Sequence, residues 1–82
     1  MSLPTYRSQK TVNAFKIKKV ELASHGGALL YPEEDGVPHV AVDAAYVKRH
    51  DPKTGGYYVR YPDGYESWSP AEAFESGFTR VD

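Results

Sequence analysis

Three histidines, a serine–histidine pair and a short acidic run are the residues of this sequence that could do chemistry. His25, His39 and His50 are separated by 14 and 11 residues, whereas metal ligands usually lie closer together on at least one element. Ser24 directly precedes His25, and chain neighbours rarely face each other as a nucleophile and its base must. Residues 33–35 are acidic but fall in a turn-like stretch, which is typical of a solvated loop. We therefore expect no catalytic residue, no metal site and no cofactor, and we expect that the protein is not an enzyme.

Size and composition narrow the class of protein further. The chain has 82 residues and no cysteine, which fits one domain without disulfides or cysteine-ligated metals. The sequence has no apolar run near the roughly 20 residues that span a bilayer, and no apolar core of a signal peptide. We therefore expect a cytoplasmic protein. Self-association adds burial to a domain this small, so a homodimer is one expected form.

The charges are unevenly distributed along the chain. The net charge of −1 argues against a general nucleic-acid-binding protein. Residues 1–19 carry five cations and no acid, whereas residues 20–47 carry five acids and no lysine or arginine. The favoured interpretation is that the two segments lie near each other and neutralise one another. The alternative is a basic arm for an anionic partner.

An aromatic hairpin is the clearest local signal. Tyr57–Tyr61 has the composition of a strand, Pro62-Asp63-Gly64 that of a tight turn, and Tyr65–Trp68 that of the returning strand. A type I turn followed by a left-handed glycine gives a three-residue hairpin loop with a bulge. This turn predicts the register of the hairpin. Tyr61 lies opposite Tyr65, and each residue before Tyr61 lies opposite the residue that is equally far after Tyr65.

The predicted register gives the hairpin two faces. One face holds Val59 with Tyr61 and Tyr65. The other face is the candidate binding surface, where Tyr58 opposes Trp68 beside an ion pair of Arg60 with Glu66. If that second face is exposed, its aromatic patch suits a contact with a protein partner or a second copy of the chain. The alternative use is to stack the bases of single-stranded nucleic acid. The same side chains could also fill a small core, and the sequence leaves open which face is buried.

The other elements form the frame for this hairpin. A residue-by-residue alternation predicts a strand over residues 11–22 with a bulge at Lys18-Lys19. Asp43 is the predicted N-cap of a short helix. Ser69 is the predicted N-cap of a second helix, where it forms a capping box with Glu72, and this helix is expected to end near Gly77. The predicted fold is a single α+β domain over residues 11–82, a small antiparallel sheet with one or two short helices, after a flexible segment over residues 1–10. Its remaining strands are expected at residues 28–31, 37–42 and 78–81.

Residues 55–75 read GGYYVRYPDGYESWSPAEAFE. This segment resembles the C-terminal part of short uncharacterised proteins encoded by bacteriophages and bacterial prophages, in which a glycine-led aromatic strand passes through a tight turn into a Ser-Pro helix. Phe78 follows that helix, and Tyr6-Arg7 with the strand from Val12 to Ile17 is similar to their N-termini. The resemblance transfers no reaction and no catalytic residue. It implies a phage-type accessory protein in the cytoplasm of a bacterial host, and we predict that this protein binds a macromolecule, most simply another protein.

Overall fold

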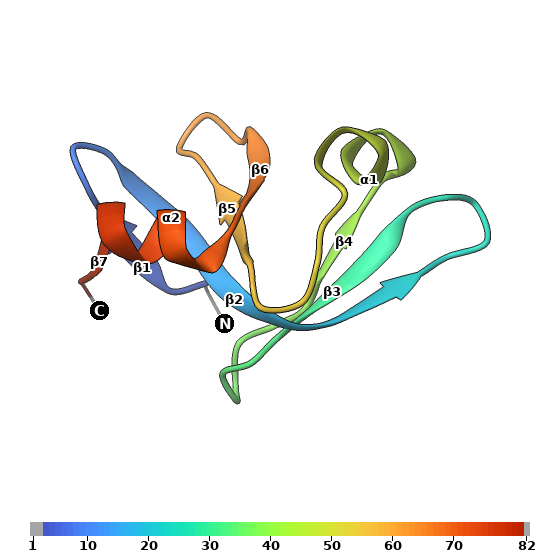
Figure 1. Cartoon of the computed structure of the whole chain (residues 1–82), viewed down its shortest axis with the longest axis horizontal. Coiled ribbons are helices and arrows are strands. Elements are labelled where there is room, and N and C mark those ends of the chain that lie inside the picture. The colour runs from blue at the N-terminus through green and yellow to red at the C-terminus, as the bar shows by residue number, and fades with distance from the viewer. Residues whose placement is uncertain (1–2, 82) are drawn as a thin grey trace.

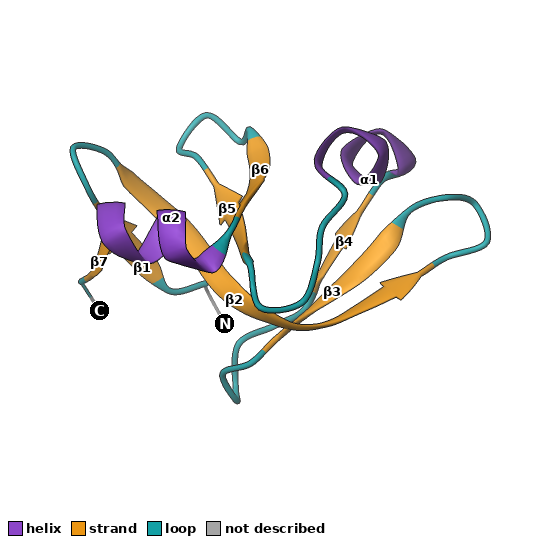
Figure 2. Ribbon diagram, viewed as in Figure 1, coloured by secondary structure: helices purple, strands orange, loops and turns teal. Residues whose placement is uncertain are grey.

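The structure is a computed structural model that describes residues 3–81, and strands dominate it (Figures 1 and 2). No helix of this part of the chain is long and apolar enough to cross a membrane. The predicted class, a small antiparallel α+β domain, agrees with the architecture, although the sheet contributes more of the fold than the helices. The elements in chain order are β1 (Thr5–Arg7), β2 (Thr11–Leu22), β3 (Ala28–Pro32), β4 (Val40–Val42), α1 (Ala44–His50), β5 (Tyr57–Arg60), β6 (Glu66–Ser69), α2 (Ala71–Gly77) and β7 (Thr79–Arg80).

The long strand β2 organises the sheet. Its N-terminal half pairs with β1 and with β5, and its C-terminal half pairs with β3. β4 extends the sheet beyond β3, β7 extends it beyond β1, and β6 pairs with β5; every pairing is antiparallel. The register of β2 against β3 shifts between Ile17 and Lys19, which confirms the predicted bulge. Because a bulge bends the strand that carries it, β2 curves beneath the rest of the sheet (Figure 1).

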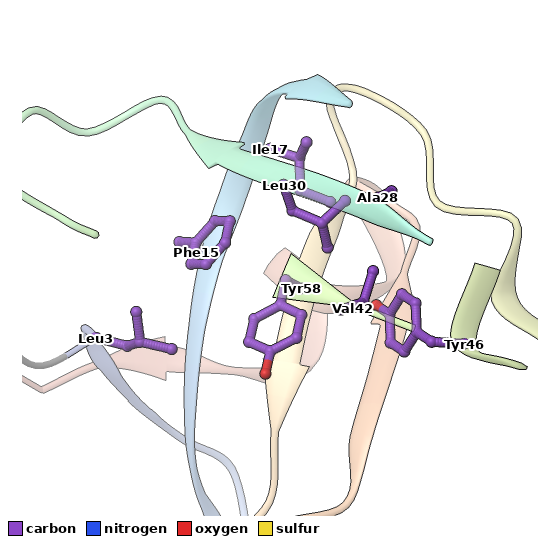
Figure 3. Close-up of a cluster of buried hydrophobic side chains, with 8 residues drawn as sticks. All are labelled: Leu3, Phe15, Ile17, Ala28, Leu30, Val42, Tyr46 and Tyr58. Atoms are coloured by element: carbon purple, nitrogen blue, oxygen red, sulfur yellow. The ribbon is translucent and has the colours of Figure 1, made fainter. Parts of the chain in front are cut away.

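This curvature produces two cores on opposite faces of the sheet. The inner cluster takes side chains from β2, β3, β4, β5 and α1, together with Leu3 (Figure 3). The outer cluster lies under α2, where Phe74 stacks on Tyr57 with ring centroids 4.2 Å apart. The inner cluster consists of Leu3, Phe15, Ile17, Ala28, Leu30, Val42, Tyr46 and Tyr58, and the outer cluster of Val12, Ala14, Tyr57, Val59 and Phe74.

Helix α1 joins β4 to the inner cluster and to β6. Asp43 is its N-cap, as predicted, because the Asp43 Oδ1 accepts a hydrogen bond of 2.8 Å from the backbone N–H of Tyr46. The Tyr46 side chain is buried, and its hydroxyl donates to the Ser67 carbonyl at 2.6 Å. The last turn of α1 is basic, which suits the negative end of the helix dipole.

The N-terminal segment differs from the prediction. Thr5–Arg7 form β1 rather than an irregular stretch, and Leu3 is buried in the inner cluster. The amide of Asn13 explains part of this order, since its Nδ2 donates to Thr5 Oγ1 at 3.2 Å and to the Leu3 carbonyl at 3.3 Å. The domain boundary at residue 11 is therefore corrected to include β1. Residues 1 and 2 of the predicted flexible segment lie outside the described residues.

The predicted start of the second helix is also corrected. Ser69 is the last residue of β6, where it pairs with Tyr57, so its backbone stays extended and its side chain caps nothing. The helix begins at Ala71 after Pro70, and no capping box with Glu72 forms. At the other end, Gly77 is the last helical residue rather than a left-handed residue beyond the helix. β4 is likewise shorter than predicted and lies at one edge of the sheet, as expected from Pro38.

Candidate functional site

The aromatic hairpin forms with the predicted register. Tyr58 pairs with Trp68 and Arg60 with Glu66. The turn is closed by hydrogen bonds from Tyr61 N to the Tyr65 carbonyl at 2.8 Å and from Gly64 N to the Tyr61 carbonyl at 2.9 Å. Gly64 has φ of +92°, a left-handed conformation that a residue with a Cβ rarely adopts. The local prediction of turn and pairing is therefore confirmed.

The sequence left open which face of the hairpin is buried, and in the structure the Tyr58–Trp68 face turns inward, so the condition for an exposed aromatic patch on that face is not met. Tyr58 has no exposed surface and stacks on Phe15 with ring centroids 5.2 Å apart (Figure 3). Trp68 is half-buried against the inner cluster, and its indole N–H donates to the Lys53 carbonyl at 3.3 Å. The physical reason is the curvature of the sheet, which turns this face of β5 and β6 inward. These two aromatic side chains therefore contribute to the core instead of an open patch.

The charged pair on the same face is joined through Tyr58. The Tyr58 hydroxyl donates to Glu66 Oε2 and accepts a 3.1 Å hydrogen bond from Arg60 Nε. The predicted link between Arg60 and Glu66 thus runs through a phenol. Burial, reinforced by the hydrogen bond to Glu66 and opposed by Arg60, raises the pKa of Tyr58 from 10.0 to about 12. Burial also raises the pKa of Tyr46, with a smaller contribution from the neighbouring Tyr58. Both phenols are therefore neutral at physiological pH and act as structural donors.

A different surface of the hairpin is open to solvent, at the tip around Tyr65. The Tyr65 side chain is 46% exposed and lies between two shallow hollows. Its ring centroid is 5.9 Å from that of Tyr61 and 6.3 Å from that of His50, and the Arg49 guanidinium carbon lies 6.0 Å from it. The tip lies between the β1–β2 loop and α1, on the same side of the molecule (Figure 1). We call this surface the tip patch; the two hollows that form it are lined by Lys10, Ala45, Tyr46, Arg49, His50, Tyr61, Pro62, Asp63, Gly64, Tyr65 and Glu66.

Sequence reasoning missed the tip patch. It grouped Tyr61 and Tyr65 with Val59 on one hairpin face, but Val59 is buried under α2 whereas Tyr65 is exposed. Lys10 and Arg49 come from segments far from the hairpin in the chain, so only the tertiary fold brings them beside it. The one available signal was the pair of aromatic residues that flank a polar turn.

The histidines lie at separate places in the fold. His25 Nδ1 accepts a 3.2 Å hydrogen bond from the backbone N–H of Gly27. His39 stacks on Tyr31 and His50 lies against Tyr46. Within residues 3–81, no three histidine or carboxylate side chains gather closely enough to hold a metal ion.

The uneven charges are partly neutralised by contacts within the fold. In the basic segment, Lys19 lies 3.7 Å from Glu21 and Lys16 lies 3.6 Å from Glu75. In the acidic segment, Glu34 binds the guanidinium of Arg80 through two hydrogen bonds. These pairs are all at least partly exposed, so each contributes little to stability.

The fold is similar to that of a known phage protein. The chain aligns with the solution NMR structure of the monomeric form of the phage L decoration protein, with a TM-score of 0.70 and 28% sequence identity. The alignment covers 95% of this chain and 59% of the other, so this chain spans about three fifths of that protein's length. No protein-family profile matches the sequence, and the curated protein sequences contain no significant match.

Proposed function

We propose that this chain is a phage-type accessory protein that attaches to the protein shell of a phage head without catalysing a reaction. The observation that carries the proposal is the similarity to the phage L decoration protein, which extends over nearly the whole chain at 28% identity. The resemblance of residues 55–75 to phage and prophage proteins points to the same origin. Such a protein would meet its partner in the cytoplasm of the bacterial host, where new particles are built.

The surface of the domain also favours a binding role. Its hollows are shallow and open, whereas sites for small molecules are usually enclosed clefts that cover most of the ligand. Three phenols have a strongly raised pKa, and each serves the packing of the fold: Tyr46 that of α1, Tyr57 that of α2 and Tyr58 that of the hairpin. A macromolecular surface is therefore the partner that these features fit best.

The direct test is co-sedimentation with phage heads. Heads of the encoding phage, prepared from a strain that lacks this gene, are mixed with the purified full chain and separated on a sucrose gradient. The proposal predicts saturable co-migration, with a fixed number of copies per head. A chain that stays at the top of the gradient at micromolar concentration would refute attachment to heads.

Self-association remains a prediction. The phage L decoration protein, to which the chain is similar, has a solved monomeric form. Sedimentation equilibrium of the free chain between 10 and 500 μM, roughly the range over which weak dimers dissociate, tests the predicted homodimer. A single species with the mass of one chain throughout would exclude it.

A further inference from the structure

Two Asp-Gly pairs occur in the chain, and each lies in an exposed turn. Asp35 and Gly36 belong to the β3–β4 loop, whereas Asp63 and Gly64 form the tip of the β5–β6 hairpin. Both glycines have a positive φ, +85° at Gly36 and +92° at Gly64. Because glycine has no side chain, the backbone nitrogen that follows each aspartate is sterically open to the aspartate carboxyl group. The two pairs are therefore chemically alike, and they differ in the hydrogen bonds that hold them.

The hairpin holds both groups of the Asp63-Gly64 pair. The Gly64 N–H donates to the Tyr61 carbonyl at 2.9 Å, so this nitrogen is engaged in the hydrogen bond that closes the turn. The Asp63 Oδ1 accepts a 2.9 Å hydrogen bond from the backbone N–H of Tyr65, which directs the carboxylate past Gly64. Each of the two groups must therefore give up a hydrogen bond before the nitrogen can reach the carboxyl carbon.

The β3–β4 loop leaves the Asp35-Gly36 pair without such bonds. Within the described residues, the Asp35 carboxylate forms no hydrogen bond or ion pair, and the Gly36 N–H donates to no acceptor. The backbone contact across this turn, from Val37 N to the Glu34 carbonyl, is 3.4 Å long. This is longer than the usual N–H···O separation of about 2.7–3.2 Å. The loop is therefore free to bring the Gly36 nitrogen onto the carboxyl carbon of Asp35.

We propose that Asp35 is a site of spontaneous isoaspartate formation and that the hairpin protects Asp63 from the same reaction. The Gly36 nitrogen attacks Cγ of the protonated Asp35 carboxyl group, whose hydroxyl leaves with the amide proton as water, and a five-membered succinimide closes. Water then adds to this ring. Attack at the main-chain carbonyl carbon breaks its bond to the Gly36 nitrogen and gives isoaspartate, whereas attack at Cγ restores aspartate. One water is released and one is consumed, so isoaspartate has the same mass as the original residue.

The modification alters a loop that contacts β7. Glu34, the chain neighbour of Asp35, binds the guanidinium of Arg80 through two hydrogen bonds. In isoaspartate the main chain runs through Cβ and Cγ, so the turn gains a methylene group and the former main-chain carbonyl becomes a free carboxylate. Glu34 must then reach Arg80 from a longer turn. This inference goes beyond the proposed function and does not depend on it.

The test is peptide mapping of the full chain after several weeks at neutral pH, with one sample folded and one unfolded in guanidinium chloride. Trypsin releases residues 20–48 with Asp35 and residues 61–80 with Asp63, so the two sites are measured in separate peptides. Electron-transfer fragmentation locates isoaspartate in each peptide, and a loss of the mass of one water marks the succinimide. In the folded chain we expect isoaspartate to form roughly tenfold or more faster at Asp35 than at Asp63, because hydrogen bonds restrain only Asp63. In the unfolded chain these bonds are absent, and the two rates should be similar.

Asp35→Glu is the matched variant, because it keeps the charge but needs a six-membered ring, which closes much more slowly. Its tryptic peptide should contain no isomerised residue at position 35, while the rate at Asp63 stays that of the wild type. The inference would be overturned by similar rates at the two sites of the folded chain, or by no isoaspartate at Asp35 while the unfolded chain converts both sites. A tenfold difference that persists in guanidinium chloride would assign the preference to the sequence neighbours and refute the protection by the hairpin.

Discussion

Replacing Tyr58 by phenylalanine removes one buried hydroxyl and leaves the ring in place. At pH 8 the loss of its hydrogen bonds to Glu66 and Arg60 should lower the free energy of unfolding by about 1.5 kcal/mol, the low end of the usual range for hydrogen bonds to charged groups. Arg60 and Glu66 are cross-strand neighbours and can then pair directly, which keeps the cost at the lower end.

The same variant should be less sensitive to alkaline pH. The folded-state pKa of Tyr58 is about 12 against 10.0 for an unperturbed phenol. Between these two values the unfolded chain releases the proton that the folded chain retains, so the wild type loses stability as pH rises. Linkage gives a loss of about 1.4 kcal/mol from this residue by pH 11. Tyr58→Phe has no such proton to release, and the stability gap of pH 8 should close by pH 11.

Urea unfolding at pH 8, 9, 10 and 11, followed by the fluorescence of Trp68, measures this gap. The difference between the two proteins isolates the Tyr58 hydroxyl together with its effect on the neighbouring Tyr46. Tyr61→Phe removes the same atom from a half-buried tyrosine on the same hairpin and is the matched control for the loss of a tyrosine hydroxyl at pH 8. A stability gap between wild type and Tyr58→Phe that stays constant from pH 8 to pH 11 would refute the assigned burial and bonding of the phenol.

Three further substitutions test the packing. Gly56→Ala would place a Cβ 2.3 Å from Trp68 Cζ2, and displacement of the indole should lower the free energy of unfolding in urea by about 1–3 kcal/mol. An unchanged urea midpoint would contradict this contact. Asp43→Ala should lose about 1 kcal/mol by removing the cap of α1, while Asp43→Asn should retain most of it; equal losses in both would argue against the cap. Phe74→Ala should lower the free energy of unfolding by about 3–5 kcal/mol, which is comparable to the whole stability of so small a domain, so circular dichroism should show a largely unfolded chain. A cooperative melt near that of the wild type would show that the packing of α2 is not needed for folding.

The features that the sequence predicted correctly are encoded by neighbouring residues. The turn at Pro62–Gly64 needs a proline and a glycine at set positions, and these determine which residues of the hairpin face each other. The cap of α1 needs only a carboxylate three residues before the backbone N–H from which it accepts a hydrogen bond. The bulge in β2 was visible as a change of parity in the apolar alternation. In each case the residues that determine the feature lie within a few positions of one another in the sequence.

The features that were missed depend on contacts between distant segments. Ser69 has the right neighbours for a capping box, but pairing with Tyr57 holds it in the sheet. The burial of Tyr58 required knowing that the sheet curls, because both faces of β5 are covered. The tip patch needed three segments to converge on Tyr65. A periodic pattern shows that a face is apolar without showing what covers it.

The pairing of β1 with β7 has a consequence for how the protein is made. Tyr6 lies opposite Arg80, so β1 can pair with one of its two neighbours only after β7, at the far end of the described residues, has been synthesised. Contacts that join such distant parts of a chain slow folding, because a long loop must close before they form. We expect the hairpin and β2–β3 to assemble on the nascent chain while that edge of β1 stays unpaired until β7 has been synthesised. Deletion of β7 would then leave an unpaired strand edge on β1, which is a common starting point for aggregation.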